Sequence, residues 1–284
     1  ARLQAAMALS GGVMNLSRVI GPAVMGLVIA QFSFTGAYFL SIALYGMAIF
    51  CMFGVNRSRS ADNGQPKKPL LADIAYGFSY IRGNRPILIC LMFGLIPMFL
   101  AMPFQSLLVM LAEQAWGVGE SGVGMLMAVG GVGGVLGAIW ILRRGDKSQR
   151  LHLMIGSTAA FGIFLAIFVQ TSNFYLAFIP LLLANMCMSA SQTVNNASIQ
   201  ILVDDNVRGR MSSFMMLSFA LTPLGVFPMA IAADQIGAAS SLFGACIILV
   251  IFVAVFYLLS ATFRSLDKNV NEAIAAEKSH TAAS

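Results

Sequence analysis

Charge is the property that this sequence has least of. Only 10% of its 284 residues are charged and 58% are hydrophobic, whereas soluble domains carry about 25% charged residues. So few charges cannot cover the surface of a soluble globule of this size. The composition excludes that class and predicts an integral membrane protein.

Metal-binding and redox-active residues are also scarce. The two histidines, His152 and His280, stand far apart, and the four cysteines fall in four different apolar stretches without CxxC spacing. Isolated cysteines of this kind are typical of small buried hydrophobes, so neither a metal site nor a disulfide framework is predicted. No cofactor is expected. The net charge of +6 does not indicate a nucleic-acid partner, because the basic residues lie in short loops between apolar runs.

Apolar stretches, in contrast, are abundant. A helix that crosses a bilayer needs about 20 mostly apolar residues, and eight windows meet this requirement. We therefore predict an all-α integral membrane protein with eight transmembrane helices. Their approximate ranges are 7–31, 34–54, 86–111, 119–142, 151–170, 174–202, 211–233 and 236–263.

Basic residues are distributed unevenly among the gaps between these windows. When the gaps are numbered alternately, one set, together with both ends of the chain, holds 16 of the 17 Lys and Arg residues. The other set holds only the acids Glu113, Glu120 and Asp234. Because positive charge accumulates on the cytoplasmic side, both ends of this chain are predicted to be cytoplasmic.

The one long gap, residues 55–85, has two parts. Residues 56–69 are polar and turn-rich, which is typical of a linker. Residues 70–82 place Leu70, Ile74, Phe78 and Ile81 on one face, which predicts a short amphipathic helix. This helix lies either on the cytoplasmic membrane surface or against the cytoplasmic ends of the bundle, and the sequence leaves both arrangements open.

Polar side chains recur in the window 174–202 at steps of 4, 3, 4 and 4, so they share one helix face. They are Asn185, Ser189, Gln192, Asn196 and Gln200. Polar groups in a membrane are costly unless they are paired or hydrated, so this stripe either lines a solute path or makes interhelical hydrogen bonds. The first three lie deep enough to line a cavity, whereas the last two lie nearer the cytoplasmic end and would brace or gate the inner mouth.

Charged residues at two further places are candidates for function. The stripe ends in a turn that carries Asp204, Asp205, Arg208 and Arg210. These residues either form an ion-pair latch at the inner mouth or anchor the loop on the cytoplasmic side. Arg18 is the only basic residue inside a window and lies about 16 Å from its start at 1.5 Å per residue, so it is predicted to face the cavity or a carboxylate.

Three groups of residues complete the candidates. In the window 86–111, Gln105 and Ser106 are possible cavity residues. The window 119–142 contains GxxxG spacings at Gly130/Gly134 and Gly133/Gly137, which let a neighbouring helix approach closely and slide. Pro223 predicts a kink in the window 211–233, and kinked spans are where transporters build hinges.

The order of several short motifs resembles the major facilitator superfamily, in particular the bacterial exporter branch that includes enterobactin and macrolide efflux proteins. These motifs are Asn15–Pro22 with Gly26, Gly77–Arg82, Asn196–Gln200, Arg208–Ser213 and Pro223–Gly225. The resemblance implies that the eight windows match spans five to twelve of a twelve-span transporter, so that the chain is a fragment or a truncated record. Residues 1–55 would then end the N-terminal bundle, 56–85 form the linker, 86–263 the six-span C-terminal bundle, and 264–284 a cytoplasmic tail.

Two family motifs can be compared residue by residue. Gly21, Pro22 and Gly26 match the antiporter motif of the fifth span, although Ser17 and Met25 replace two of its glycines. The resemblance also implies a gating salt bridge between Asp146 and a basic residue such as Arg150. Gln149 replaces the glycine that the family usually has in this loop.

The resemblance implies a secondary active exporter of the bacterial inner membrane, which moves an amphipathic small molecule such as a siderophore or a drug by alternating access and exchanges it for protons. The expected partners are this solute, protons, the lipid bilayer and the missing N-terminal spans. The alternative is a non-transporting half-carrier or a membrane scaffold or assembly subunit. An enzyme is not indicated, because the only carboxylate pair, Asp204–Asp205, lacks a nucleophile and a base.

Overall fold

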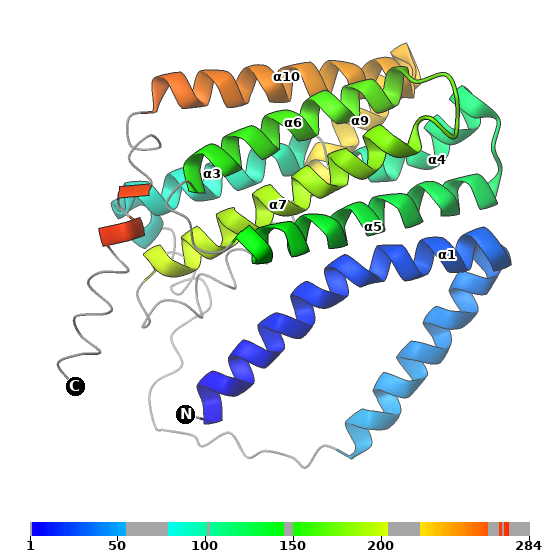
Figure 1. Ribbon diagram of the computed structural model, residues 1–284. Coiled ribbons are helices and arrows are strands. Elements are labelled where there is room, and N and C mark those ends of the chain that lie inside the picture. Colours follow the sequence, from blue (N-terminus) through cyan, green and yellow to red (C-terminus); the bar gives the residue numbers. More distant parts are fainter. Residues whose placement is uncertain are drawn as a thin grey trace.

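The computed structural model of the protein describes residues 2–54, 79–100, 103–144, 150–203, 222–260, 267–268 and 270–272, and within residues 2–23 it describes the backbone together with Ser17 and Gly21. Throughout these ranges the regular structure is helical (Figure 1). The helices are α1 (Arg2–Phe53), α3 (Arg85–Leu100), α4 (Pro103–Trp116), α5 (Glu120–Arg144), α6 (Arg150–Gln170), α7 (Phe178–Leu202), α9 (Pro223–Ile236) and α10 (Ala238–Leu259).

Helix α1 consists of two limbs that meet at Ser33. Ser33 has φ 64° and ψ 177°, a backbone conformation that is almost confined to glycine and costs other residues about 1–3 kcal/mol. The first limb packs along α5, and the second limb runs back away from the bundle (Figure 1). The break falls in the gap between the predicted windows 7–31 and 34–54.

The other helices form one bundle, with α7 between α5 and α6 and with α10 beside α6 (Figure 1). The bend of α1, the α4–α5 connection, the α6–α7 turn and the α9–α10 junction all lie at one end of this bundle. We call this the turn end. The core of the bundle is apolar, and its largest fully buried side chains include Phe93, Phe161 and Phe168.

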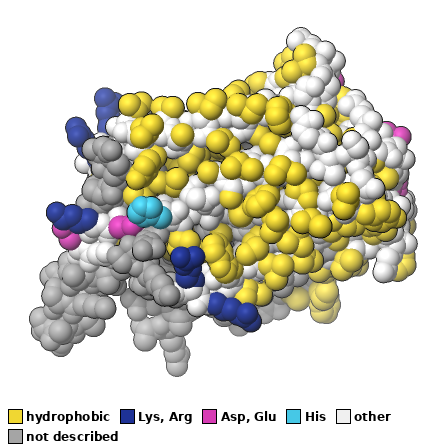
Figure 2. Space-filling view, turned by 45° about the horizontal axis from the view of Figure 1, so that its top comes forward, with side chains coloured by type: hydrophobic (Ala, Val, Ile, Leu, Met, Phe, Trp, Pro, Cys, Tyr) yellow, Lys and Arg dark blue, Asp and Glu magenta, His cyan; other side chains and the backbone are white. Residues whose placement is uncertain are grey.

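Large apolar side chains are also abundant on the surface of the bundle. Large hydrophobic side chains cover the middle of the molecule in Figure 2. Basic side chains gather at the end opposite the turn end, and this basic end includes Arg143 and Arg144 in the last turn of α5. An apolar belt between polar ends is what a bilayer requires, since lipid rather than water covers the belt.

Five stretches in the described part of the chain are long and apolar enough to cross a membrane. They are Val24–Phe53, Arg85–Trp116, Glu120–Arg144, Arg150–Gln170 and Ala238–Leu259. Helix α7 is not among them, because its asparagines and glutamines lower its hydropathy, and α9 has only 14 described residues. These stretches establish a multi-pass membrane protein, while the count of eight spans stays a prediction.

Two predicted segments are described in part. The window 86–111 falls within the stretch Arg85–Trp116, whose described residues form α3 and α4, and residues 101 and 102 lie outside the described residues. Of the predicted amphipathic helix 70–82, only residues 79–82 are described. They are helical, and Ile81 is 3% exposed within the bundle core.

The C-terminal segment is attached to the basic end of the bundle. The backbone N–H of Leu151 in the first turn of α6 donates to Asp267 Oδ1 at 3.0 Å. Val270, three residues further on, is completely buried in the bundle core. Asp267 therefore satisfies one of the free N–H groups at the start of α6, and Val270 holds the segment in place.

Candidate functional site

The deep part of the predicted polar stripe lies at the contact between α7 and α5. The side chain of Asn185 lies over Gly130 and Gly133, and that of Ser189 over Gly137. The Asn185 amide nitrogen donates to the carbonyl oxygen of Leu181, one turn earlier in α7, at 2.9 Å. The hydrogen bond gives the amide nitrogen a partner within the protein, and in this structure both side chains contribute to helix packing. Their role as cavity residues stays a prediction.

The rest of the stripe is more accessible. Gln192 and Asn196 are half-buried and Gln200 is exposed. Gln105 and Ser106 are exposed on α4. These side chains approach the solvent or the lipid from two different helices, and their part in a solute path also stays a prediction.

A second row of polar residues lies on another face of α7, and the sequence interpretation missed it. It consists of Ser191, Asn195 and Ser198, which are spaced by 4 and 3 and are all buried. The Ser191 hydroxyl is hydrogen bonded to the Thr158 hydroxyl of α6 at 2.6 Å and lies 3.4 Å from the carbonyl oxygen of Met154. The same periodicity that identified the first row was available in the sequence to identify this one.

Asn195 occupies the contact between α7 and α3. It is 6% exposed, and its amide nitrogen lies only 2.6 Å from where a Cβ at Gly94 would stand. Only a glycine at position 94 leaves room for this amide. Its Oδ1 atom is buried and has no hydrogen-bond partner among the described residues.

Removing the Thr158–Ser191 hydrogen bond is expected to have a small, measurable effect. Interhelical hydrogen bonds in membrane proteins contribute about 0.6 kcal/mol on average. A double-mutant cycle of Thr158→Val and Ser191→Ala, measured by unfolding in detergent or bicelles, should give a coupling energy of about this size. Ser198→Ala is the matched control, because the Ser198 hydroxyl donates to Val194 of its own helix at 2.8 Å. Zero coupling between Thr158 and Ser191 would contradict the assignment.

Glycines bring α1 and α5 into direct backbone contact. A Cβ at Gly26 would lie 2.8 Å from the carbonyl oxygen of Gly124, and a Cβ at Gly124 would lie 2.8 Å from that of Gly26. Small residues on both helices therefore allow the two backbones to touch. By contrast, a Cβ at Gly21 would meet nothing within 4 Å.

The remaining predicted hinge residues lie in different settings. Gly130 contacts Asn185, whereas a Cβ at Gly134 would meet nothing within 4 Å. The glycine pair that faces α7 is therefore Gly133/Gly137. Pro223 is exposed at the start of α9.

Several predicted gate residues lie outside the description. Arg150 begins α6 at the basic end and is half-buried. The side chains of Arg18 and Pro22 lie outside the described residues, although their backbone belongs to α1. The residues Asp146, Asp204, Asp205, Arg208 and Arg210 also lie outside them. The salt bridge and the ion-pair latch at the inner mouth stay predictions.

A further polar contact joins α1 to α5 at the turn end. The carboxylate of Glu120, in the first turn of α5, accepts hydrogen bonds from the Ser33 hydroxyl and, at 3.2 Å, from the backbone N–H of Phe34. No sequence signal pairs residues 87 positions apart, so this contact could only be found in the structure.

One groove lies between α6 and α10 and has a volume of about 550 Å³. Its lining is mostly apolar and includes Ile163, Ile167, Ile247 and Ile251, which are all exposed. None of the predicted solute-path residues lines it. Among the residues that the structure describes, no three His, Cys, Asp or Glu side chains come together to hold a metal ion.

Spanning helices, buried polar rows and backbone contacts through glycine define a multi-pass membrane protein with closely packed helices. The family model described as transmembrane secretion effector matches residues 1–280. The chain belongs to this family, which is part of the major facilitator superfamily.

Two curated relatives agree with this assignment. The staphyloferrin A transporter of Staphylococcus aureus is 22% identical over 227 residues, which cover 79% of this chain and 56% of the relative. The uncharacterized MFS-type transporter YfiS of Bacillus subtilis is 26% identical over 160 residues, 55% of this chain and 38% of the relative. The chain thus spans about half the length of these relatives or less. No solved structure matches it.

Proposed function

We propose that this chain is part of a secondary active exporter that moves an amphipathic small molecule, such as a siderophore or a drug, across the bacterial inner membrane in exchange for protons. The observation that carries the proposal is the family match over residues 1–280. The relative whose name specifies a solute, the staphyloferrin A transporter, supports a small organic molecule as the cargo.

The contact between α1 and α5 fits alternating access. In such a mechanism two helix bundles rock about a central site, and their common boundary needs surfaces that slide on each other. The contact through Gly26 and Gly124 is smooth because no side chains interlock there. We assign the first limb of α1 to one bundle and α5 to the other.

The polar residues of α7 supply one wall of the proposed path. Gln192 and Asn196 are half-buried and so are accessible to a solute. Asn185 and Ser189 pack on α5, which belongs to the same bundle as α7, so they would support this wall from behind. The proton-carrying acids are expected on spans outside this chain, and the basic end of the bundle is expected to face the cytoplasm.

The test is a transport assay in cells that lack the full-length gene. We expect these cells to retain several-fold more staphyloferrin A, enterobactin, macrolide or dye than the parent strain, and a plasmid-borne copy should restore export. Collapse of the proton gradient by a protonophore should abolish the difference. Unchanged retention of all these compounds would remove the exporter assignment and favour a half-carrier or scaffold, and accumulation only in the parent strain would show import.

A further inference from the structure

The bend of α1 at Ser33 is held in an unfavourable conformation. Within the described part of the chain, Ser33 is the only residue other than glycine with positive φ. Helix interruptions normally use glycine at such a position. A serine there requires outside contacts that compensate for the strained backbone.

Glu120 provides these contacts from α5. Its carboxylate accepts hydrogen bonds from the Ser33 hydroxyl and from the backbone N–H of Phe34. Phe34 begins the second limb of α1, so its N–H is one of the groups that a helix start leaves unpaired. Glu120 also lies in the first turn of α5. One carboxylate therefore lies at two helix N-termini, where the helix dipoles favour negative charge.

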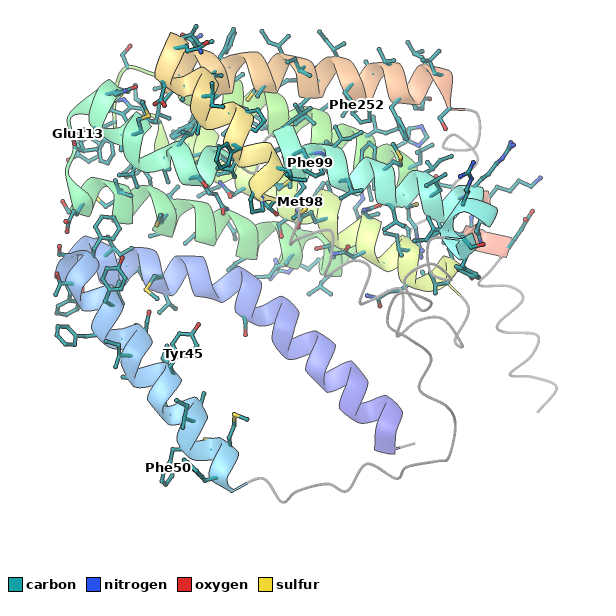
Figure 3. All side chains as sticks on the ribbon, turned by 180° about the vertical axis from the view of Figure 1, so that it is seen from behind. Tyr45, Phe50, Met98, Phe99, Glu113 and Phe252 are labelled. Carbon is teal, nitrogen blue, oxygen red and sulfur yellow. The ribbon has the colours of Figure 1, made fainter. Side chains whose placement is uncertain are left out.

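The second limb has few other contacts with the bundle. Phe34 packs against the core and Ala37 is buried, but the limb beyond them is largely exposed. Tyr45 and Phe50, which are labelled in Figure 3, are 71% and 78% exposed on this limb. Among the described residues, its contacts with the α3–α10 bundle are thus concentrated in its first turns, beside Glu120.

We propose that the contact of Glu120 with Ser33 and Phe34 is a latch that holds the turn end of the transporter closed. The proposal rests on the transport function proposed above. The hydrogen bonds to Glu120 favour the closed arrangement, and the strained backbone of Ser33 favours its release. When the turn end opens, the hydrogen bonds to the Glu120 carboxylate break and the Ser33 backbone adopts an unstrained conformation. The angle between the two limbs of α1 therefore changes together with the opening.

The test measures opening directly in the complete protein reconstituted in liposomes. After the exposed Cys51 is replaced by Ser, spin labels are attached at Tyr38→Cys on the second limb and at Ser172→Cys in the α6–α7 turn, both exposed positions. The distance distribution between the labels reports the ratio of open to closed molecules. Glu120→Ala should raise this ratio at least tenfold, since it removes two hydrogen bonds to a charged acceptor.

The matched control is Glu113→Ala. Glu113 is exposed at the end of the molecule where α1 bends (Figure 3), and its replacement should leave the ratio unchanged. If Glu120→Ala does not fold, Glu120→Gln takes its place and should give a smaller shift in the same direction. A ratio in the Glu120 variant equal to that in the Glu113 variant would overturn the latch.

Two substitutions at Ser33 separate the hydrogen bond from the strain. Ser33→Ala and Ser33→Gly both remove the hydroxyl, but only glycine adopts the observed backbone without strain. The glycine variant should therefore be several-fold more closed than the alanine variant, and equal ratios would overturn the strained part of the latch. Transport is assayed in the same preparations. If the label distances change in the variants but no transport is measured, the latch is supported and the exporter is refuted. If transport is measured but the label distances do not change in the variants, the latch alone is refuted.

Discussion

Gly26→Ala is expected to separate α1 from α5 and to inactivate the protein, whereas Gly21→Ala, five residues earlier in the same helix, should slightly stabilise it. The added methyl group at position 26 would lie 2.8 Å from both the Gly124 carbonyl oxygen and the Ala128 Cα. Both are backbone atoms of a long helix and cannot turn aside as a side chain can. We expect a loss of about 1–3 kcal/mol, the usual cost of overpacking, and at least a tenfold loss of transport.

Gly21→Ala is the control for this prediction, because its stability should change in the opposite direction. A Cβ there meets nothing within 4 Å, and alanine is favoured over glycine within a helix by up to about 1 kcal/mol. The temperature of unfolding in detergent, measured by size-exclusion chromatography of heated samples, should therefore rise for Gly21→Ala and fall for Gly26→Ala. Equal shifts for both would show that helix propensity, not the α1–α5 contact, determines the result.

The helices themselves are largely readable from the sequence. The predicted windows 119–142 and 151–170 agree with α5 (Glu120–Arg144) and α6 (Arg150–Gln170) within two residues. The reason is physical: each span needs about 20 apolar residues, and the polar gaps between spans are short. The window 86–111 likewise falls within the stretch Arg85–Trp116, which is long and apolar enough for one span and contains α3 and α4.

The sequence does not predict in the same way which helix packs against each helix face. The spacing of Asn185 and Ser189 shows that they share a face of α7, but periodicity fixes a direction about the helix axis and names no neighbour. The contact with the glycines of α5 arises from the packing of the whole bundle. The same holds for Glu120, whose bond to Ser33 joins residues that the sequence separates by a linker and two further helices.

Conversion of the α5 glycines that face α7 to alanine is the second change with a large expected effect. In Gly137→Ala the new methyl group would lie 3.0 Å from the carbonyl carbon of Met186 and 3.0 Å from Ser189 Cβ. In Gly133→Ala it would lie 3.1 Å from the Leu182 carbonyl carbon. The double variant should lose about 2–4 kcal/mol, twice the lower part of the overpacking range, and should unfold at a clearly lower temperature.

Gly134→Ala is the control on the same helix, because its Cβ would meet nothing within 4 Å, and it should be as stable as the parent or more so. Adding Ser189→Gly to Gly137→Ala tests which atoms oppose the methyl group. The nearest group is the Met186 backbone carbonyl, so removing the Ser189 side chain should not restore stability. Full rescue would show that side chains separate α5 from α7 and that the two backbones are not in direct contact.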